Sequence, residues 1–270
     1  MAREHSGPGK VDVDGHPELL EHRHPLAMVY GGGGVFGIAY TAGVAEGLID
    51  AGLPVATAPS LGTSAGSWTA SALALGMRYA DYSGAPTPRV PNLRTGVLAD
   101  IARGIFGSAT HHLVAVSAVC VTTGRRHVLD GGAYPLADLV AASSAVPGLL
   151  PPHRVAGRWY VDGGMWSATS IDASAEADRV IVVAPLAGSV VGPVGRTAGF
   201  LLGQELRRCR TRHASCDLHM IRPNREIARL AGRTPLSLFD PRRARAVYPL
   251  AYRQGLMWGE RILAGDRPAA

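Results

Sequence analysis

The residue best suited to chemistry in this chain is Ser64, the centre of a Gly-Thr-Ser-Ala-Gly segment at residues 62–66. A serine hydroxyl acts as a nucleophile when a tight turn exposes it and a nearby base takes its proton. A Gly-x-Ser-x-Gly turn between a strand and a helix gives that exposure, because its glycines allow a backbone path that a Cβ would block. The apolar residues 55–61 and the Ala-rich residues 65–75 predict this strand and this helix. The alternative is a glycine-rich structural turn, in a chain that has 34 glycines.

A second glycine cluster, Gly-Gly-Gly-Gly-Val-Phe-Gly, lies upstream at residues 31–37. Three of its glycines have the spacing of the dinucleotide-binding fingerprint, but the next predicted strand, within 53–61, has no acid to bind a ribose. The other interpretation is an oxyanion hole, in which backbone amides bind a carbonyl oxygen as it becomes negative. The amides of this predicted oxyanion hole are those of Gly32, Gly33, Gly34 and Ala65.

A base for Ser64 must come from elsewhere in the chain. None of the downstream histidines follows a late strand as a Ser-His-Asp triad requires, and we interpret them as surface or structural residues. A carboxylate is the alternative, because an aspartate at a strand end can act directly as a general base. Asp162 has this position in an Asp-Gly-Gly segment after a predicted strand at 159–161. Asp130 begins a second Asp-Gly-Gly segment but leads into a proline-started helix, which favours a turn role.

These elements, in this order, resemble the patatin-like phospholipases, which use a Ser-Asp dyad, a glycine-rich oxyanion loop and an Asp-Gly-Gly or Asp-Gly-Ala motif. The resemblance implies that Ser64 is the nucleophile, that Asp162 is the base and that Gly32–Gly34 form the oxyanion loop. It also covers Ala-Ser-Ser-Ala-Val-Pro-Gly at 142–148. The family's catalytic aspartate follows that segment, which selects Asp162 over Asp130. The other glycines of the matching motifs are Gly37, Gly62, Gly66, Gly163 and Gly164.

The similarity runs from about Leu26 to Pro223 and departs at Phe36, where the family usually has Arg or Lys. The oxyanion amides belong to the backbone, so Phe36 does not remove them. It does remove a cation that could hold the loop or meet a phosphate. The expectation of activity on charged phospholipids is therefore weaker than that of esterase activity.

Alternating strand and helix patterns predict a three-layer α/β/α fold with a mainly parallel central sheet. We expect a flexible lead-in at 1–24 and one domain at 25–270, with the motifs within about 26–223 and a basic helical part at the C-terminus. The expected strands are 26–30, 55–61, 113–121, 159–161, 180–184 and 218–221. The expected helices are 37–51, 65–75, 135–144, 195–212 and 242–263, and 81–96 is expected to be a loop.

The net charge of +6 is distributed unevenly along the 270 residues. Residues 196–270 carry 15 arginines and 6 acidic residues, a balance of +9, whereas the rest of the chain is slightly acidic. Such a surface could meet an anionic membrane, although a solvated Arg-rich surface is the simpler explanation. We expect no nucleic-acid partner, no metal and no cofactor, because no such motif accompanies the charge. The polar N-terminus shows no signal peptide, which predicts a cytoplasmic or peripheral-membrane protein with reduced thiols at Cys120, Cys209 and Cys216.

The sequence thus predicts a serine hydrolase that cleaves the carboxylic esters of lipids, as a phospholipase or esterase, or of other acyl compounds. Two alternatives remain open. An acyltransferase on the same fold would use an alcohol or thiol in place of water. A catalytically silent member would bind lipid or protein, an alternative that Phe36 suggests. Acyl chain length, head group and oligomeric state lie beyond what the sequence predicts.

Overall fold

The computed structural model describes residue 17, residues 22–187 and residues 216–265. The strands are β1 (His24–Tyr30), β2 (Ser60–Thr63), β3 (Val114–Cys120), β4 (Arg126–Asp130), β5 (His153–Val155), β6 (Arg158–Asp162), β7 (Ala177–Val183) and β8 (Asp217–Ile221). The α-helices are α1 (Gly34–Asp50), α2 (Ala65–Ala74), α3 (Tyr79–Tyr82), α4 (Val97–Phe106), α5 (Leu136–Ser143), α7 (Arg225–Leu230) and α8 (Pro241–Leu263). Short 3₁₀ turns are η2 (Val55–Thr57), η3 (Gly163–Met165), η4 (Ile171–Ala173) and η5 (Pro235–Phe239).

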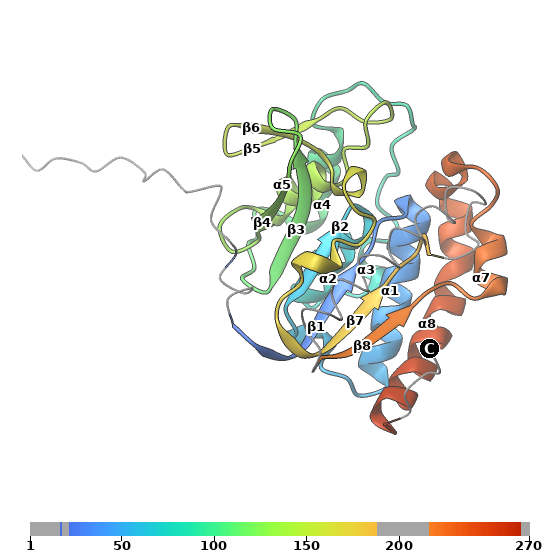
Figure 1. The fold of residues 1–270 in the computed structure, drawn as a ribbon. Coiled ribbons are helices and arrows are strands. Elements are labelled where there is room, and N and C mark those ends of the chain that lie inside the picture. Colours follow the sequence, from blue (N-terminus) through green and yellow to red (C-terminus); the bar gives the residue numbers. More distant parts are fainter. Residues whose placement is uncertain (1–16, 18–21, 188–215, 266–270) are drawn as a thin grey trace, which may run out of the picture.

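The strands form one eight-stranded sheet in the order β5-β6-β3-β2-β1-β7-β8, with β4 also paired to β3 (Figure 1). The five strands from β3 to β8 along this order are parallel to their neighbours, whereas β4, β6 and β5 pair antiparallel. The carboxyl ends of the parallel strands therefore meet at one edge of the sheet, where ligands bind in folds of this kind. This arrangement confirms the predicted α/β class with a central sheet flanked by helices.

Pairing along β3 brings the ends of β2 and β6 together. One edge of β3 is occupied by β4 opposite residues 115–119, so β2 and β6 share the other edge. On that edge, β2 ends with Thr63 opposite Ser117. On the same edge, β6 arrives from the opposite direction and ends with Asp162 opposite Ala118. Because these two β3 residues are consecutive, the carboxyl ends of β2 and β6 meet head to head.

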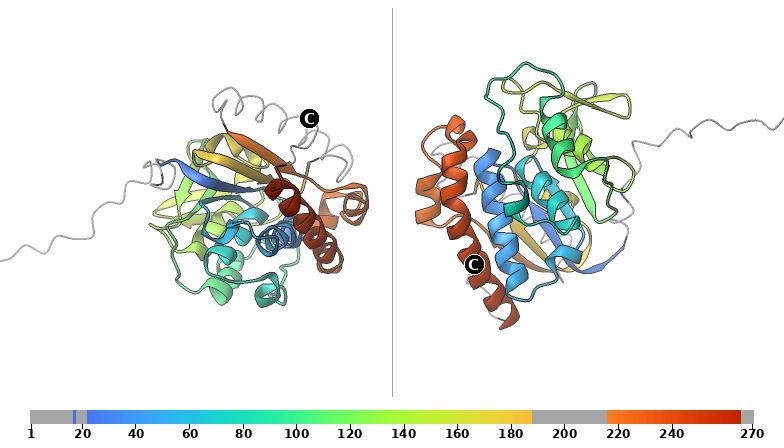
Figure 2. Two further views of the ribbon diagram at one scale, coloured as in Figure 1. Left: turned by 90° about the horizontal axis from the view of Figure 1, so that it is seen from below. Right: turned by 180° about the vertical axis from the view of Figure 1, so that it is seen from behind.

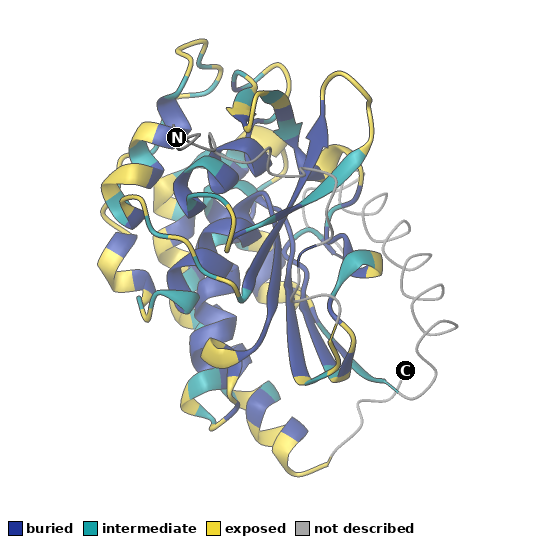
Figure 3. Ribbon diagram, turned by 90° about the vertical axis from the view of Figure 1, so that its left-hand side faces the viewer, coloured by how far each residue is buried: buried dark blue, intermediate teal, exposed yellow. Residues whose placement is uncertain are grey.

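Alternate residues of β1 are buried on opposite faces of the sheet, as a strand covered on both sides requires. Met28 and Tyr30 belong to the larger cluster of buried side chains, to which α1, α2, α4, α5 and α8 contribute. Ala27 and Val29 belong to a smaller cluster, which Ile171 also joins. Figure 3 shows the central strands buried, and Figure 2 shows the helices of the described residues gathered over one face.

Helices α1 and α8 lie side by side and contact each other closely (Figures 1 and 2). Glycines make this approach feasible. A Cβ at Gly47 would overlap the backbone of Tyr252, and a Cβ at Gly255 would overlap the backbone of Val44. The helix backbones thus pack without intervening side chains. This packing anchors α1, whose first residues lie at the candidate site.

The structure corrects one predicted strand. The apolar residues 55–61 were expected to be extended, but residues 55–57 form η2 and β2 begins only at Ser60. The Ala58 amide donates to the Val55 carbonyl and closes a turn there. Val55 and Ala58 are nevertheless buried, at 1% and 6% exposure. A buried turn therefore gave the same apolar pattern as a strand.

Several elements were not predicted, namely α3, α4, β4, β5 and α7. The sequence of β4, Arg-His-Val-Leu-Asp, lacks the apolar alternation of a half-buried strand, and pairing with β3 determines its conformation. The expected helix at 195–212 and most of the expected lead-in at 1–24 lie outside the described residues. No helix within the described ranges is long and apolar enough to cross a membrane.

Candidate active site

Ser64 lies in the sharp turn between β2 and α2, with φ 51° and ψ −119°. Few residues other than glycine adopt this conformation, and holding one there costs about 1–3 kcal/mol. The two flanking glycines are required by close packing. A Cβ at Gly62 would overlap the backbone of Ser67, and a Cβ at Gly66 would overlap the carbonyl of Tyr30. The turn therefore presents the Ser64 side chain at the carboxyl edge of the sheet, at the first turn of α2.

The Ser64 hydroxyl donates a hydrogen bond to Asp162 Oδ2 at 2.6 Å. The meeting of β2 and β6 on β3 accounts for this contact, because Ser64 follows the last residue of β2 and Asp162 ends β6. The other carboxylate oxygen, Oδ1, accepts the Gly164 amide at 2.6 Å. Gly163 must be a glycine, since a Cβ there would overlap the Ser117 carbonyl. Both oxygens of Asp162 are thus held, and one of them faces the serine.

Burial determines the protonation of Asp162. Its side chain is only 4% exposed, and this loss of water raises the pKa of the carboxyl from 3.8 to about 6. The hydrogen bonds from Ser64 and Gly164 act in the opposite direction and lower that pKa. A carboxylate with a pKa nearer to neutral accepts a proton more readily than an exposed one. Asp162 is therefore ionised at neutral pH and is a stronger base than an ordinary aspartate.

Two serines support the turn. The Ser64 amide donates to Ser143 Oγ at 2.8 Å, and Ser143 Oγ donates to the Ser117 carbonyl at 2.7 Å. This chain of bonds ties the turn to β3. Ser144, the residue after Ser143, accepts a hydrogen bond from the Trp68 indole N–H at 3.0 Å. Both serines lie in the segment at 142–148 that the family resemblance includes, although no role for either was inferred from the sequence.

The glycine cluster lies against the Ser64 turn. A Cβ built on Gly32 would be 3.3 Å from the Ser64 Cβ, and one on Gly37 would be 3.0 Å from the Ala65 Cβ. The Gly32 amide donates to the Ala168 carbonyl at 2.9 Å, which removes it from the set of predicted oxyanion donors. Gly33 and Gly34 begin α1 and Ala65 begins α2. The first amides of a helix have no partner within it, so these three positions suit an anion.

Phe36 is fully buried and belongs to the larger hydrophobic cluster. It stands where the resembling family usually has Arg or Lys, and it points into the core. The position therefore supports α1 by packing and presents no charge to the site.

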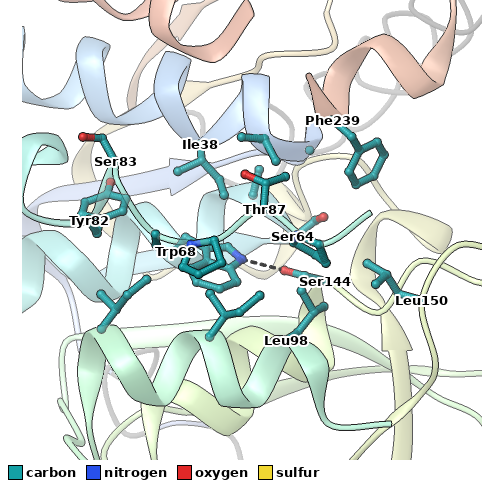
Figure 4. A pocket seen from close by; sticks show the side chains of 18 of the residues that line it. Ile38, Ser64, Trp68, Tyr82, Ser83, Thr87, Leu98, Ser144, Leu150 and Phe239 are labelled. Carbon is teal, nitrogen blue, oxygen red and sulfur yellow. Dashed lines mark hydrogen bonds between the residues drawn. The ribbon is translucent and has the colours of Figure 1, made fainter. Parts of the chain in front are cut away.

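A mostly apolar pocket adjoins Ser64 (Figure 4). Gly34, Ala65 and Ser144 line it near the serine. The apolar side chains that form much of its wall are Ile38, Trp68, Leu98, Ile101, Leu150 and Phe239. A lining of this kind accommodates a hydrocarbon chain, and Ser144 adds a hydroxyl beside Ser64 (Figure 4).

The other candidates from the sequence lie apart from this pocket. Asp130 Oδ1 accepts the Gly132 amide at 2.8 Å, the geometry of a turn residue. His219 lies within β8 and contacts Asp217 at 3.0 Å. Among the described residues, no histidine lines the pocket and no group of three metal-ligating side chains is found.

The fold and the paired Ser64 and Asp162 define a class of α/β protein with a serine turn at the carboxyl edge of its sheet. Residues 85–174 match the family model of the patatin-like phospholipases. The resemblance inferred from the motifs is therefore confirmed, and lipid esters are the substrates of this family. The matched range includes Asp162 and the segment at 142–148, whereas Ser64 and the glycine cluster lie before it.

A solved structure, VipD from Legionella pneumophila, is 16% identical, with a TM-score of 0.44 over 88% of this chain and 67% of VipD. No curated protein matches the chain.

Proposed function

We propose that this protein is a serine hydrolase that cleaves carboxylic esters of lipids through a dyad of Ser64 and Asp162. The observation that carries the proposal is the 2.6 Å hydrogen bond between the Ser64 hydroxyl and a buried carboxylate. This distance lies within the reach of direct proton transfer. The elevated pKa of Asp162, about 6, gives the carboxylate the basicity that such a transfer needs.

In the first half of the reaction, Asp162 takes the hydroxyl proton while Ser64 Oγ bonds to the ester carbonyl carbon. The negative charge that develops on the carbonyl oxygen is stabilised by the amides of Gly33, Gly34 and Ala65, together with the N-terminal ends of α1 and α2. As the ester C–O bond breaks, Asp162 returns its proton to the departing alkoxide. An acyl group then remains bonded to Ser64 Oγ.

In the second half, water enters, Asp162 takes one of its protons, and the resulting oxygen bonds to the acyl carbon. The bond to Ser64 Oγ breaks, Oγ regains the proton from Asp162, and a carboxylic acid leaves. An alcohol in place of water would make the same intermediate an acyl donor. Supplying an alcohol acceptor and measuring ester formation against hydrolysis distinguishes these two outcomes.

The buried carboxylate of Asp162 and the strained backbone of Ser64 argue against the catalytically silent alternative. A protein that only binds lipid has no need of a residue at φ 51° or of an ionised buried aspartate, and each of these features destabilises the fold. Phe36, which suggested that alternative, lies in the core and leaves the amides of the glycine cluster in place.

The direct test combines covalent labelling with two substitutions. A fluorophosphonate probe should label the wild-type protein at Ser64, and Ser64→Ala should abolish that labelling. We expect Ser64→Ala and Asp162→Asn to lower kcat for a short p-nitrophenyl ester by at least about 10³-fold. Ser108→Ala, at an exposed loop residue, is the matched control and should behave as wild type. Normal hydrolysis by both dyad variants would overturn the proposal.

We further propose that the pocket entrance meets an anionic membrane. Leu236 is 55% exposed in η5, the turn that ends at the pocket residue Phe239. Arg233 and Arg242 flank this turn and are exposed. Exposed apolar residues among arginines favour an anionic lipid surface. Co-sedimentation with anionic and with neutral vesicles tests this, and equal binding to both would refute it. The expected cytoplasmic location stays a prediction.

A further inference from the structure

A second and more open cavity adjoins the Ser64 pocket. It has a volume of about 680 Å³, against about 100 Å³ for the pocket at Ser64. The wall of this outer cavity comes from α4, from the end of α3 and from the segment after α3. Most of that wall is apolar, and Asp81, Arg94 and Asp100 stand among its lining residues. Nothing in the proposed reaction at Ser64 uses this space.

The two cavities are separated by one layer of side chains. Six residues line both of them: Tyr82, Ala85, Pro86, Pro88, Ile101 and Ile105. The first four belong to the chain from the end of α3 through residue 88, which we call the strap, and the last two belong to α4. Since the same residues face both spaces, their side chains form the partition between the Ser64 pocket and the outer cavity.

The inner pocket, which contains Ser64, extends toward this partition. Figure 4 shows Phe239 and Leu150 on one side of Ser64, and Trp68 followed by Tyr82 and Ser83 on the other side. An acyl chain bonded at Ser64 that follows the pocket on the Trp68 side runs toward Tyr82. Tyr82 also lines the outer cavity, so a chain that runs this way reaches the partition between the two spaces.

The strap is weakly tied to its surroundings. Pro86 and Pro88 have no backbone N–H to donate. Within residues 85–91, the described backbone hydrogen bonds include only that from the Ala85 amide to the Tyr82 carbonyl, at 3.0 Å. Side-chain packing against α4, rather than a backbone ladder, therefore sets the width of the partition. A wall held in this way can be displaced by a long hydrocarbon chain at low cost.

We infer that the outer cavity receives the distal part of a long acyl chain whose ester end lies at Ser64. The inference rests on the proposed hydrolase function and deepens it by assigning a place to the distal methylenes of the acyl chain. The small inner pocket holds the first carbons of the chain, and the outer cavity supplies the room that further methylenes need. Each methylene moved out of water strengthens binding by about fourfold.

Gly104 offers a test that leaves the inner pocket untouched. It lies on α4, lines only the outer cavity, and an added Cβ there would meet no atom within 4 Å. Gly104→Trp should fill part of the outer cavity. Gly104→Ala is the matched control, because it makes the same backbone change without filling the cavity. Both variants replace a glycine inside a helix, which favours the helix.

The assay compares a C4 and a C16 p-nitrophenyl ester in mixed micelles of fixed composition. We expect Gly104→Trp to lower kcat/KM for the C16 ester by about tenfold or more, since the burial of several methylenes is lost. The C4 ester should be hydrolysed as in wild type, and Gly104→Ala should resemble wild type with both. As a second variant, Ile105→Ala thins the partition and should raise the C16-to-C4 ratio.

An unchanged C16-to-C4 ratio in Gly104→Trp would overturn the inference, and so would an equal loss with both esters. In either case C4 hydrolysis by the wild-type protein would leave the proposed function standing. No hydrolysis of either ester by the wild-type protein would refute the proposed function and this inference together.

Discussion

Replacing Asp162 by Asn should stabilise the protein at neutral pH while removing its activity. The amide is nearly isosteric with the carboxyl. Its oxygen can accept the Gly164 amide as Oδ1 does, and its NH₂ can donate to Ser64 Oγ in place of the hydrogen bond at Oδ2. The substitution therefore removes a buried charge and keeps the local hydrogen bonds. In the wild-type protein, Asp162 is charged at pH 7 and protonated at pH 4. Burial opposes the charged form, so Asp162 contributes less to the free energy of unfolding at pH 7 than at pH 4.

The magnitude follows from the pKa. A folded-state pKa of about 6, against 3.8 for an exposed aspartate, corresponds to about 3 kcal/mol, because each pKa unit is worth about 1.4 kcal/mol. Below about pH 4 the carboxyl carries a proton in both the folded and the unfolded chain, so the penalty vanishes. Between about pH 4 and 6 the folded protein binds more protons than the unfolded chain, and its stability falls as the pH rises. Above about pH 6 the full penalty applies.

Urea unfolding of both proteins from pH 4.5 to 7.5 measures this difference. The free energy of unfolding of Asp162→Asn, relative to wild type, should rise by about 2 kcal/mol over that range. In parallel, wild-type kcat/KM should rise through about pH 6 as Asp162 loses its proton. Asp178→Asn is the control, because Asp178 is exposed and its pair with Arg23 lies at the surface. It should change stability by less than about 0.5 kcal/mol at every pH.

Two outcomes would refute this reasoning. A stability difference between Asp162→Asn and wild type that is the same at every pH would mean that burial does not perturb Asp162. A variant that is less stable than wild type at pH 7.5 would mean that contacts to the charged form outweigh the loss of water.

Two further predictions concern the supports of the site. Ser143→Ala leaves the Ser64 amide without its acceptor, which should lower kcat by about tenfold or more with little change in KM, whereas Ser143→Thr should retain part of the activity. Steady-state kinetics on a short ester distinguishes this positioning role from a loss of substrate binding, which would raise KM instead. Gly47→Ala should lower the free energy of unfolding by about 1–3 kcal/mol, because its Cβ would overlap the Tyr252 backbone. Urea unfolding measures this loss, and a stability equal to wild type would show that α1 and α8 can separate without cost.

The sequence predicted the elements that carry short-range signals. The serine turn at 62–66 and the helix after it could be predicted because glycine spacing and an Ala-rich run are local features. The position of Asp162 at a strand end suggested it as the base and the family resemblance selected it over Asp130, but a sequence separation of 98 gives no local signal of the contact with Ser64. The register of β2 and β6 along β3 explains that contact, and register depends on which strands pair.

Other features of the site depend on packing that a linear pattern does not record. The Gly32 amide was predicted to bind an oxyanion, but it donates to Ala168, a residue brought there by the chain after β6. Ser143 gave no signal in the sequence beyond its place in the segment at 142–148. Its hydroxyl matters because α5 places it between the Ser64 amide and the Ser117 carbonyl.

The candidate site combines two features that lower stability, the φ of 51° at Ser64 and the buried charge of Asp162. Such costs persist only where the surrounding structure holds the residues firmly. Here β3 carries the strand ends on both sides of the site, and α1 is fixed by its close packing against α8. Loosening the α1–α8 contact should therefore relax the serine turn as well as lower global stability. In Gly47→Ala, a loss of kcat that exceeds the loss of folded protein would reveal that coupling.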